Sequence, residues 1–260
     1  MQTELKNKLS SGHYDFIDFG CSKGDSLVFG RDHLGGRNGL GIDIDPKKVQ
    51  TSIERGEDAL VVDATEVGSY KNAVSFSIMA HFLEHLPGLP LAMKCIESAV
   101  SISRDFVFIR QPWFDADGQL LQNELKLYWS DWGGHQNPMT TLDFYRAIRR
   151  LKSKKPVSWA IDGSNRIYSS ASKFVLPLNA PANRHFYDPQ KDGRKHFSLF
   201  NYPVYQEIIC VIQLSNRVGT AEIMNFARNN RFPKGSLAYR VVNSKPVHHR
   251  KLQLIASSEQ

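Results

Sequence analysis

The residues of this chain that are best placed to do chemistry lie in and just after one glycine-containing loop. An acid ends an apolar run and is followed by small residues at alternate positions: Asp18, Gly20, Ser22 and Gly24. Glycine lets the backbone approach a ligand closely because it carries no Cβ atom. Asp43 ends a second apolar run 19 positions beyond Gly24, where its carboxylate could accept hydrogen bonds from both hydroxyls of a ribose. Loop and carboxylate together predict a nucleoside-binding site.

The loop does not match the two common phosphate-binding patterns. A dinucleotide fingerprint reads G-x-G-x-x-G, and here Ser22 stands where a middle glycine is needed. A P-loop ends in Gly-Lys-Ser/Thr, whereas here Lys23 precedes Gly24 and Asp25 follows it. An acid at the start of a helix is a poor neighbour for a diphosphate, which binds helix N–H groups and positive charge. We therefore expect a nucleoside ligand without phosphates.

The elements that must position these residues form a strand, a glycine turn, a helix and a second strand. We predict a strand over 15–19, a helix over 25–33 and a strand over 39–43. Helical spacing of apolar residues predicts another helix over 89–103, and Thr140 or Thr141 could cap a helix that runs through 144–148. The further predicted strands are 59–63, 73–78, 106–110, 156–161 and 207–214. This alternation indicates an α/β fold whose ligand lies at the carboxyl ends of the strands.

Five segments, taken in order, resemble the motifs of the class I S-adenosylmethionine-dependent methyltransferases. They are the loop from Asp18 to Gly24, the segment Gly41–Pro46, the segment Val61–Ala64, the "LEHL" segment His81–Pro87 and the segment Phe106–Pro112. Together they cover roughly residues 14–150. The resemblance implies a seven-stranded, mostly parallel, doubly wound sheet of the Rossmann-like methyltransferase fold. Its last strand would be antiparallel and would lie between strands five and six.

The resemblance also implies S-adenosylmethionine as cofactor and assigns its contacts. Asp18 would lie near the methionine amino group or the loop backbone, and Gly20, Ser22 and Gly24 would form the loop around the cofactor. Asp43 would bind the ribose, and Asp63 with Ala64 would meet the adenine edge. Asp45, which precedes Pro46, is better explained as the cap of the next helix.

The His81-x-x-Glu84-His85 segment leaves several interpretations open. Its spacing matches that of inverted zinc peptidases, although no scaffold of that kind is indicated. Some quinone-pathway O-methyltransferases bind a divalent metal here through an acid, a glutamate and a histidine, but this chain has His81 in place of the acid. In the simplest interpretation, Glu84 and His85 orient each other and the cofactor loop. We assign no metal ligand and predict that His81 faces the sulfonium pocket as a catalytic candidate.

A second catalytic candidate is His135, within a segment that resembles the "G-H-x-x-x-x-T" segment of small-molecule methyltransferases. An imidazole can take a proton from a hydroxyl near neutral pH. The segment 113–140 is rich in Trp and Tyr, which stack on sugar rings and planar acceptors, and with 178–204 it is a candidate lid. We therefore expect O-methylation of a small molecule or glycan. The alternatives are an RNA methyltransferase, although the Asn/Asp-Pro-Pro-Tyr motif is missing, and a non-catalytic cofactor-binding protein.

Composition bounds these expectations. The formal net charge of +7 is concentrated after residue 222, where 223–258 contains seven Lys or Arg residues and no acid. We predict one methyltransferase domain over 1–222 and a basic tail over 223–260 that could bind an anionic partner. No run of 18 apolar residues or apolar signal core is present, so neither a membrane span nor secretion is expected. Cys21, Cys95 and Cys210 are scattered, which favours reduced thiols and a cytoplasmic location.

Overall fold

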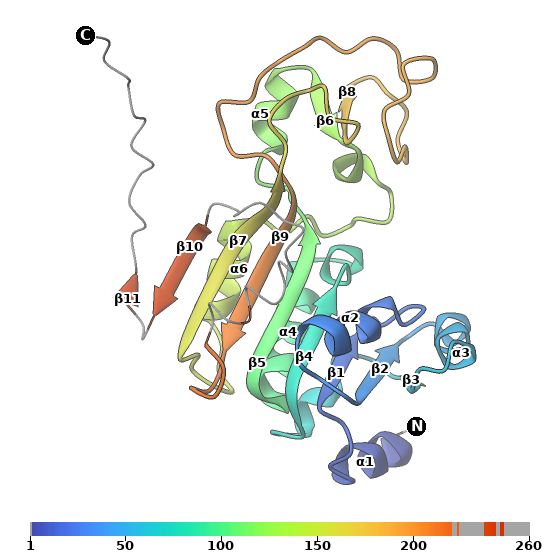
Figure 1. The fold of residues 1–260 in the computed structure, drawn as a ribbon, viewed down its shortest axis with the longest axis vertical. Helices are drawn as coiled ribbons and strands as arrows, with labels where there is room; N and C mark the ends of the chain where they lie inside the picture. Colours follow the sequence, from blue (N-terminus) through green and yellow to red (C-terminus); the bar gives the residue numbers. More distant parts are fainter. Residues whose placement is uncertain (1, 220–222, 224–236, 243–244, 247–260) are drawn as a thin grey trace.

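The computed structural model describes residues 2–219, 223, 237–242 and 245–246. Its centre is one twisted sheet, in which nine strands of the described residues run in the order β11-β10-β7-β9-β5-β4-β1-β2-β3 (Figure 1). These strands are β1 (Phe16–Phe19), β2 (Gly39–Asp43), β3 (Ala59–Val61), β4 (Val74–Ala80), β5 (Ser103–Pro112), β7 (Ser158–Arg166), β9 (Tyr205–Gln213), β10 (Leu237–Val242) and β11 (Lys245–Pro246).

The pairing confirms the predicted fold class. Neighbours from β3 to β5 are parallel, whereas β9 is antiparallel to both β5 and β7 and lies between them. The strands from β3 to β7 are thus seven and mostly parallel, with one reversed strand. β10 pairs with β7 and extends the sheet beyond the seven strands. The rest of the predicted basic tail lies largely outside the described residues, so the boundary at 222 stays a prediction.

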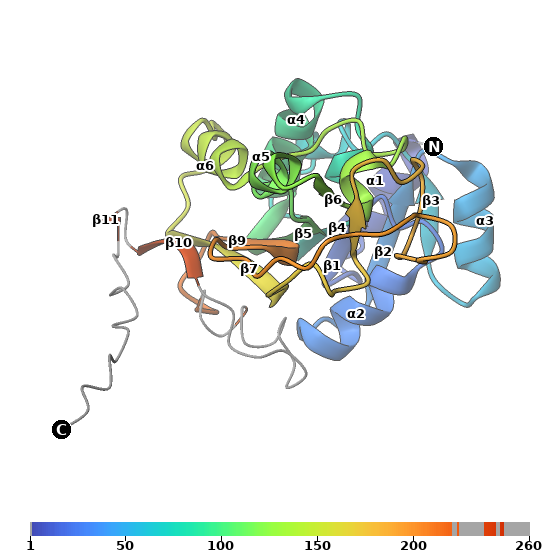
Figure 2. The same cartoon turned by 90° about the horizontal axis from the view of Figure 1, so that it is seen from above.

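Helices cover both faces of the sheet (Figure 2). One face carries α4 (Leu89–Ile102) and α6 (Thr141–Arg149), and the other carries α2 (Asp25–His33). Thr140 begins α6 through a reciprocal capping box with Asp143, which decides between the two candidate caps, Thr140 and Thr141. The remaining helical segments are α1 (Gln2–Ser10), α3 (Pro46–Glu54), α5 (Asp117–Gln122) and the 3₁₀ turns η1 (Val67–Ser69), η2 (Leu83–His85) and η3 (Tyr128–Asp131). Among the described residues, no helix has the length and apolar character to cross a membrane.

The core has a layer on each side of the sheet, because β4 and β5 are buried along most of their length and place apolar side chains on both faces. On the α2 side, Phe16, Phe76 and Phe106 come from three neighbouring strands and stack with ring centroids 4.9 and 4.6 Å apart. On the α4 and α6 side, the layer includes Phe144 and extends to Leu5 of α1. Packing on both faces fixes the strand ends that carry the site.

A cap of shorter elements stands over the carboxyl ends of β4 and β5 (Figure 1). It consists of α5, β6 (Leu125–Leu127), η3 and β8 (Val175–Pro177), with the long segment 178–204 wrapped around them. β6 and β8 pair as a separate two-stranded antiparallel sheet. The candidate lid 113–140 therefore contains regular structure.

Candidate functional site

The loop after β1 is held in a conformation that suits glycine. Gly20, Ser22 and Gly24 all have positive φ, at 70°, 48° and 91°. The amides of Gly20 and Cys21 both donate to the carbonyl of Ile42, which ties the loop to the end of β2. A Cβ atom on Gly24 would lie 2.8 Å from the side chains of Ser52 and Glu57. The loop therefore needs glycine at position 24 for both backbone and steric reasons.

At Gly20 the close neighbour is a side chain of the protein. A Cβ atom there would overlap the ring of Phe82, which lies against the loop. The sequence interpretation placed the ligand at this position and did not identify Phe82. The ring could not be recognised from the sequence, because it reaches the loop only through the turn after β4.

Asp43 braces the loop from the end of β2. Its Oδ2 atom accepts from the amide of Ser22 and its Oδ1 atom from the amide of Asp45, each at 3.0 Å. The residue is only 8% exposed. Asp45 caps α3 by accepting from the amide of Lys47 at 2.9 Å, which agrees with the role predicted from the sequence. The two acids thus have different roles despite lying two residues apart.

A cavity of about 490 Å³ opens beside this loop and contains most of the predicted cofactor contacts. Asp43 and Asp63 contribute its acids, and the largely exposed Ile44 and the partly buried Leu91 contribute apolar surface. Asp63 also accepts from the amide of Thr65 at 2.8 Å. The predicted residues that line the cavity are Gly20, Ser22, Asp43, Asp63, Ala64 and His81.

Asp18 and Gly24 lie behind the loop and do not line this cavity. Asp18 is fully buried, and its Oδ2 atom accepts from the hydroxyl of Ser26. Burial raises the pKa of Asp18 to about 8, although the Ser26 hydroxyl opposes the rise; the nearby charges of Asp43 and Glu57 add to it. Through its hydrogen bond with Ser26, Asp18 is held against α2, the helix that follows the loop.

His81 lies at the end of β4 with a positive φ of 52° and lines two cavities. Its Nε2 atom lies 3.1 Å from Glu207, and its Nδ1 atom lies 3.3 Å from Glu84. Burial lowers the pKa of His81, but the hydrogen bond with Glu207 and the interaction with Glu84 outweigh burial and raise the pKa to about 9. His81 is therefore protonated at neutral pH, where it can donate a hydrogen bond but cannot accept a proton.

A second cavity of about 270 Å³ lies under the cap and shares His81 and His85 with the first. Its aromatic lining comes from the cap: Tyr128, Trp129, Trp132, Phe174 and His185. Both candidate lids therefore contribute to one site, since Trp132 comes from 113–140 and His185 from 178–204. Their rings approach each other with centroids 4.6 Å apart.

The segment that carries His135 is clamped onto η2. The amide of Asn137 donates to the carbonyl of Glu84, and its side-chain nitrogen donates to the carbonyl of Leu83, each at 3.0 Å. Asn137 is buried. These bonds bring His135 beside His85, with ring centroids 5.0 Å apart. The sequence interpretation assigned no role to Asn137, because its partners, the carbonyls of Leu83 and Glu84, lie more than 50 residues away in the sequence.

His135 itself presents one nitrogen for chemistry. Its Nδ1 atom lies 2.8 Å from the carbonyl oxygen of Trp129, which can only accept, so Nδ1 carries the proton. Burial lowers the pKa of His135 despite this hydrogen bond. The neutral ring therefore has a lone pair on Nε2 at neutral pH.

The inverted zinc-peptidase interpretation fails on geometry, because His81 and His85 do not share a helix face. Residues 83–85 form the 3₁₀ turn η2, and His81 lies before it with a left-handed backbone. Instead, ligand atoms of Glu84, His85 and His135 lie within 4.8 Å of one another, as a metal site would require. The sequence interpretation assigned no metal ligand, because His81 stands in place of the acid that related proteins use. His135 is 50 residues from His85 in the sequence, and the fold brings the two together.

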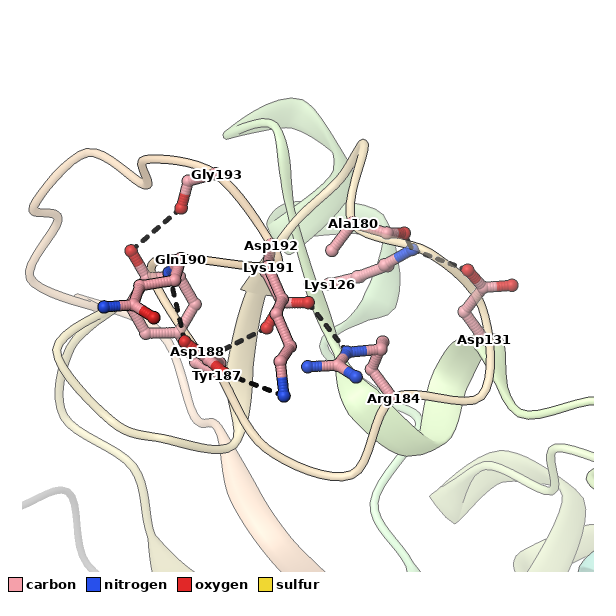
Figure 3. Close-up of polar contacts among 10 residues, drawn as sticks. All are labelled: Lys126, Asp131, Ala180, Arg184, Tyr187, Asp188, Gln190, Lys191, Asp192 and Gly193. Carbon is pink, nitrogen blue, oxygen red and sulfur yellow. Dashed lines mark hydrogen bonds and ion pairs between the residues drawn. The ribbon is translucent and has the colours of Figure 1, made fainter.

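Polar contacts within the cap hold the wall of the second cavity (Figure 3). Lys126 is 9% exposed; it pairs with Asp131 at 2.6 Å and donates to the carbonyl of Ala180. Farther along, the buried carboxylate of Asp192 pairs with Arg184 at 2.8 Å and accepts from the amide of Asp188 at 2.7 Å. The segment 178–193 is therefore fixed by internal bonds rather than by an apolar core of its own.

Comparisons with known proteins agree with this architecture. No family model matches the chain, and a search of curated proteins finds no match. Solved structures do match. A SAM-dependent methyltransferase from Archaeoglobus fulgidus is 15% identical, with 82% of this chain and 94% of the other covered and a TM-score of 0.50. A putative methyltransferase from Bacillus halodurans is 9% identical, with 81% and 98% covered and a TM-score of 0.50. The fold is the Rossmann-like methyltransferase fold.

Another match is magnesium protoporphyrin IX methyltransferase from Synechocystis with bound SAH, which is 13% identical over 82% of this chain and 83% of the other, with a TM-score of 0.47. At such identities the similarity establishes the fold alone.

Proposed function

We propose that this protein is an S-adenosylmethionine-dependent methyltransferase that methylates a hydroxyl group of a small molecule or glycan. The observation that carries the proposal is the adjacency of two cavities at the carboxyl ends of the strands. One has the glycine loop and the acids suited to a nucleoside, the other is aromatic, and His81 and His85 belong to both. A transferred group at this junction would face an acceptor in the aromatic cavity.

The side chains that line the first cavity suit the cofactor. Each oxygen of Asp43 accepts one backbone hydrogen bond and has a further lone pair for a ribose hydroxyl. Asp63 lies beyond it for a purine amino group, and Ile44 and Leu91 offer apolar surface for the rings. Bound S-adenosylmethionine would supply an electrophilic methyl group on a sulfonium.

The chain's own residues would position the acceptor and exclude water. Trp129 and Trp132 form part of the aromatic wall, on which a sugar or planar ring can stack. The Nε2 lone pair of His135 is the proposed base for the acceptor hydroxyl proton. The acceptor oxygen would then take the methyl group as the carbon–sulfur bond breaks, and the sulfonium would leave as a neutral thioether.

The two alternatives stay open as outcomes of the test. An RNA acceptor would use the basic tail, whose described strands β10 and β11 lie at the opposite edge of the sheet from β3. A non-catalytic protein would keep the cofactor cavity and transfer nothing. Neither alternative accounts for the aromatic cavity as directly as a small ring-bearing acceptor does.

Calorimetry and methyl transfer test the proposal in two stages. S-adenosylmethionine and its demethylated product should bind with micromolar affinity, and labelled methyl should pass from the cofactor into the small-molecule or glycan fraction of a lysate. His135→Ala should lower turnover about 100-fold or more without changing cofactor affinity. Tight NAD binding without any response to S-adenosylmethionine would refute the assignment, and label found only in RNA would favour the first alternative.

A further inference from the structure

We propose that Glu207 binds a hydroxyl group of the acceptor, and that the aromatic cavity selects a single sugar ring. Glu207 lines that cavity from the start of β9, and the sequence interpretation assigned it no role. The proposal deepens the proposed function, because it names the acceptor class of the same site. It rests on that function for the transfer of a methyl group, but not for the binding of the sugar.

One oxygen of the Glu207 carboxylate is held between two cations. Its Oε1 atom accepts from Nε2 of His81 at 3.1 Å, and Nε of Arg110 lies 3.7 Å from the same oxygen. Burial opposes the ionisation of Glu207, but the hydrogen bond with His81 and the charge of Arg110 outweigh burial and lower the pKa of Glu207. Glu207 is therefore a carboxylate at neutral pH, and its contacts fix its orientation in the cavity.

The other oxygen of Glu207 is available to a ligand. Its Oε2 atom accepts no hydrogen bond within the part of the chain that the structure describes, yet it is not sealed from solvent. The side chain of Glu207 is 20% exposed. A hydrogen bond to a charged oxygen is about twice as strong as one between neutral groups. Because Oε1 is already anchored, little side-chain freedom is lost when Oε2 accepts from a ligand.

Two further polar side chains of the cavity have unused hydrogen-bonding capacity. Tyr128 and Gln206 line it, and among the described residues neither the hydroxyl of Tyr128 nor the side-chain amide of Gln206 has a hydrogen-bond partner. Both groups can donate and accept. Tyr128 belongs to η3 of the cap and Gln206 to β9, so the polar groups come from two elements. A ring with hydroxyls at several positions could bond to all three side chains.

The aromatic lining and the size of the cavity agree with a sugar. Trp132 and Phe174 offer apolar surface on which the C–H face of a sugar ring can pack. The volume of about 270 Å³ lies at the lower end for small-molecule sites, which suits one ring rather than a polycyclic acceptor. A catechol is the main competitor. Its two adjacent hydroxyls could bind Glu207, but they would leave Tyr128 and Gln206 without partners.

Ligand binding tests the site without requiring methyl transfer. We would screen methyl glycosides of common hexoses, pentoses and uronic acids, together with catechol and simple phenols, by saturation-transfer NMR. The full chain would be used with and without the demethylated cofactor. We expect at least one glycoside to bind, and catechol and the phenols not to bind. A deoxy analogue that lacks the hydroxyl bound by Glu207 should bind wild type about tenfold or more weakly.

Glu207→Gln is the decisive variant, because it removes the charge and keeps the shape and an acceptor for His81. It should weaken glycoside binding about tenfold or more. Its affinity for the deoxy analogue should equal that of wild type, since the lost contact is already absent. The exposed Glu4 supplies the control Glu4→Gln, which should bind the glycoside as wild type does. If Glu207→Gln does not fold, Glu207→Asp should show the same loss, because its carboxylate is one methylene shorter.

The outcomes separate this proposal from the proposed function. Binding of catechol or a phenol in place of every glycoside, or of no ligand in the panel, would overturn the sugar site. Equal glycoside affinity in wild type and Glu207→Gln would also overturn it. An equal loss for the glycoside and for each deoxy analogue would mean that Glu207 acts only through His81, which contradicts the proposal. Wild type that binds the glycoside but not S-adenosylmethionine would refute the proposed function alone.

Discussion

Replacement of Asp43 by alanine tests the cofactor site at the residue on which most of its geometry depends. In the proposed complex each carboxylate oxygen would hold one backbone amide and one ribose hydroxyl, in a position that is only 8% exposed. Hydrogen bonds to a charged group contribute about 1.5–3 kcal/mol. If the ribose contacts are worth that much, Asp43→Ala should weaken S-adenosylmethionine binding by about 10- to 150-fold, since about 1.4 kcal/mol corresponds to a factor of ten.

The same substitution would also loosen the loop, so binding and folding must be measured separately. Asp43→Ala removes the acceptor for the amides of Ser22 and Asp45 and should lower the free energy of unfolding in urea. The matched control is Asp45→Ala. Asp45 caps α3 and does not line the cavity, so its loss should cost about 1 kcal/mol of stability and leave cofactor affinity within about twofold.

Calorimetry with S-adenosylmethionine and with its demethylated product, at a temperature where both variants are folded, provides the measurement. The reasoning would be wrong if Asp43→Ala bound the cofactor within about threefold of wild type. It would also be wrong if Asp45→Ala weakened binding as much as Asp43→Ala, since the loss would then reflect the loop and not the ribose contact.

Three further predictions follow from other parts of the structure. Gly20→Ala should lower the free energy of unfolding by about 1–3 kcal/mol. The control Gly35→Ala should cost less, because both glycines have positive φ but, of the two, only Gly20 faces a side chain, that of Phe82. Equal losses in urea unfolding would contradict this prediction. Asp18 has a folded pKa of about 8 against an ordinary value of 3.8, so its contribution to stability is present below about pH 4 and is lost as pH rises to about 8. Asp18→Asn should therefore gain stability relative to wild type between pH 5 and 8, and a pH-independent difference would exclude the raised pKa. Asp192→Asn should speed amide hydrogen exchange across 181–193, because it weakens the contacts with Arg184 and Asp188. The control Lys191→Ala removes only an exposed ion pair and should leave the exchange rates unchanged. Equal exchange rates in the two variants would show that the Arg184 and Asp188 contacts do not hold the segment.

The strands and the cofactor loop could be predicted because their signals are local. The helix 25–33 and the strand 39–43 match the structure at both ends, and Thr140 caps α6 as expected. β5 is longer than predicted, because its pairing continues into polar residues at both ends, at Ser103 and at Gln111. β4 runs two residues past its predicted end, to Ala80. Side-chain geometry at the junction of the cavities was harder to predict. Glu207 reaches His81 only because β9 is antiparallel to β5 and places residue 207 opposite Pro112.

The cap shows the same limit. The Trp- and Tyr-rich composition of 113–140 suggested an acceptor wall, but the contact between Trp132 and His185 joins two segments far apart in sequence. The clamp made by Asn137 depends on two carbonyls of η2, and the "LEHL" motif that marks this turn does not indicate which distant side chain binds them. Such contacts are set by tertiary packing, and local sequence patterns do not encode them.

The last two strands of the seven-stranded core make the cap exchangeable. The segment 167–204 leaves the sheet after Arg166 and returns at Tyr205, and these two residues are register partners on adjacent strands. Its ends are therefore held together by the sheet, whatever lies between them, and the entropy of closing a longer or shorter loop changes only slowly with length. A segment from a related protein could be grafted between these positions if it supplied apolar side chains in place of Ile167, Val175, Phe200 and Val204, which belong to the core. Substrate preference could thus be redesigned, or could diverge in evolution, without altering the cofactor loop.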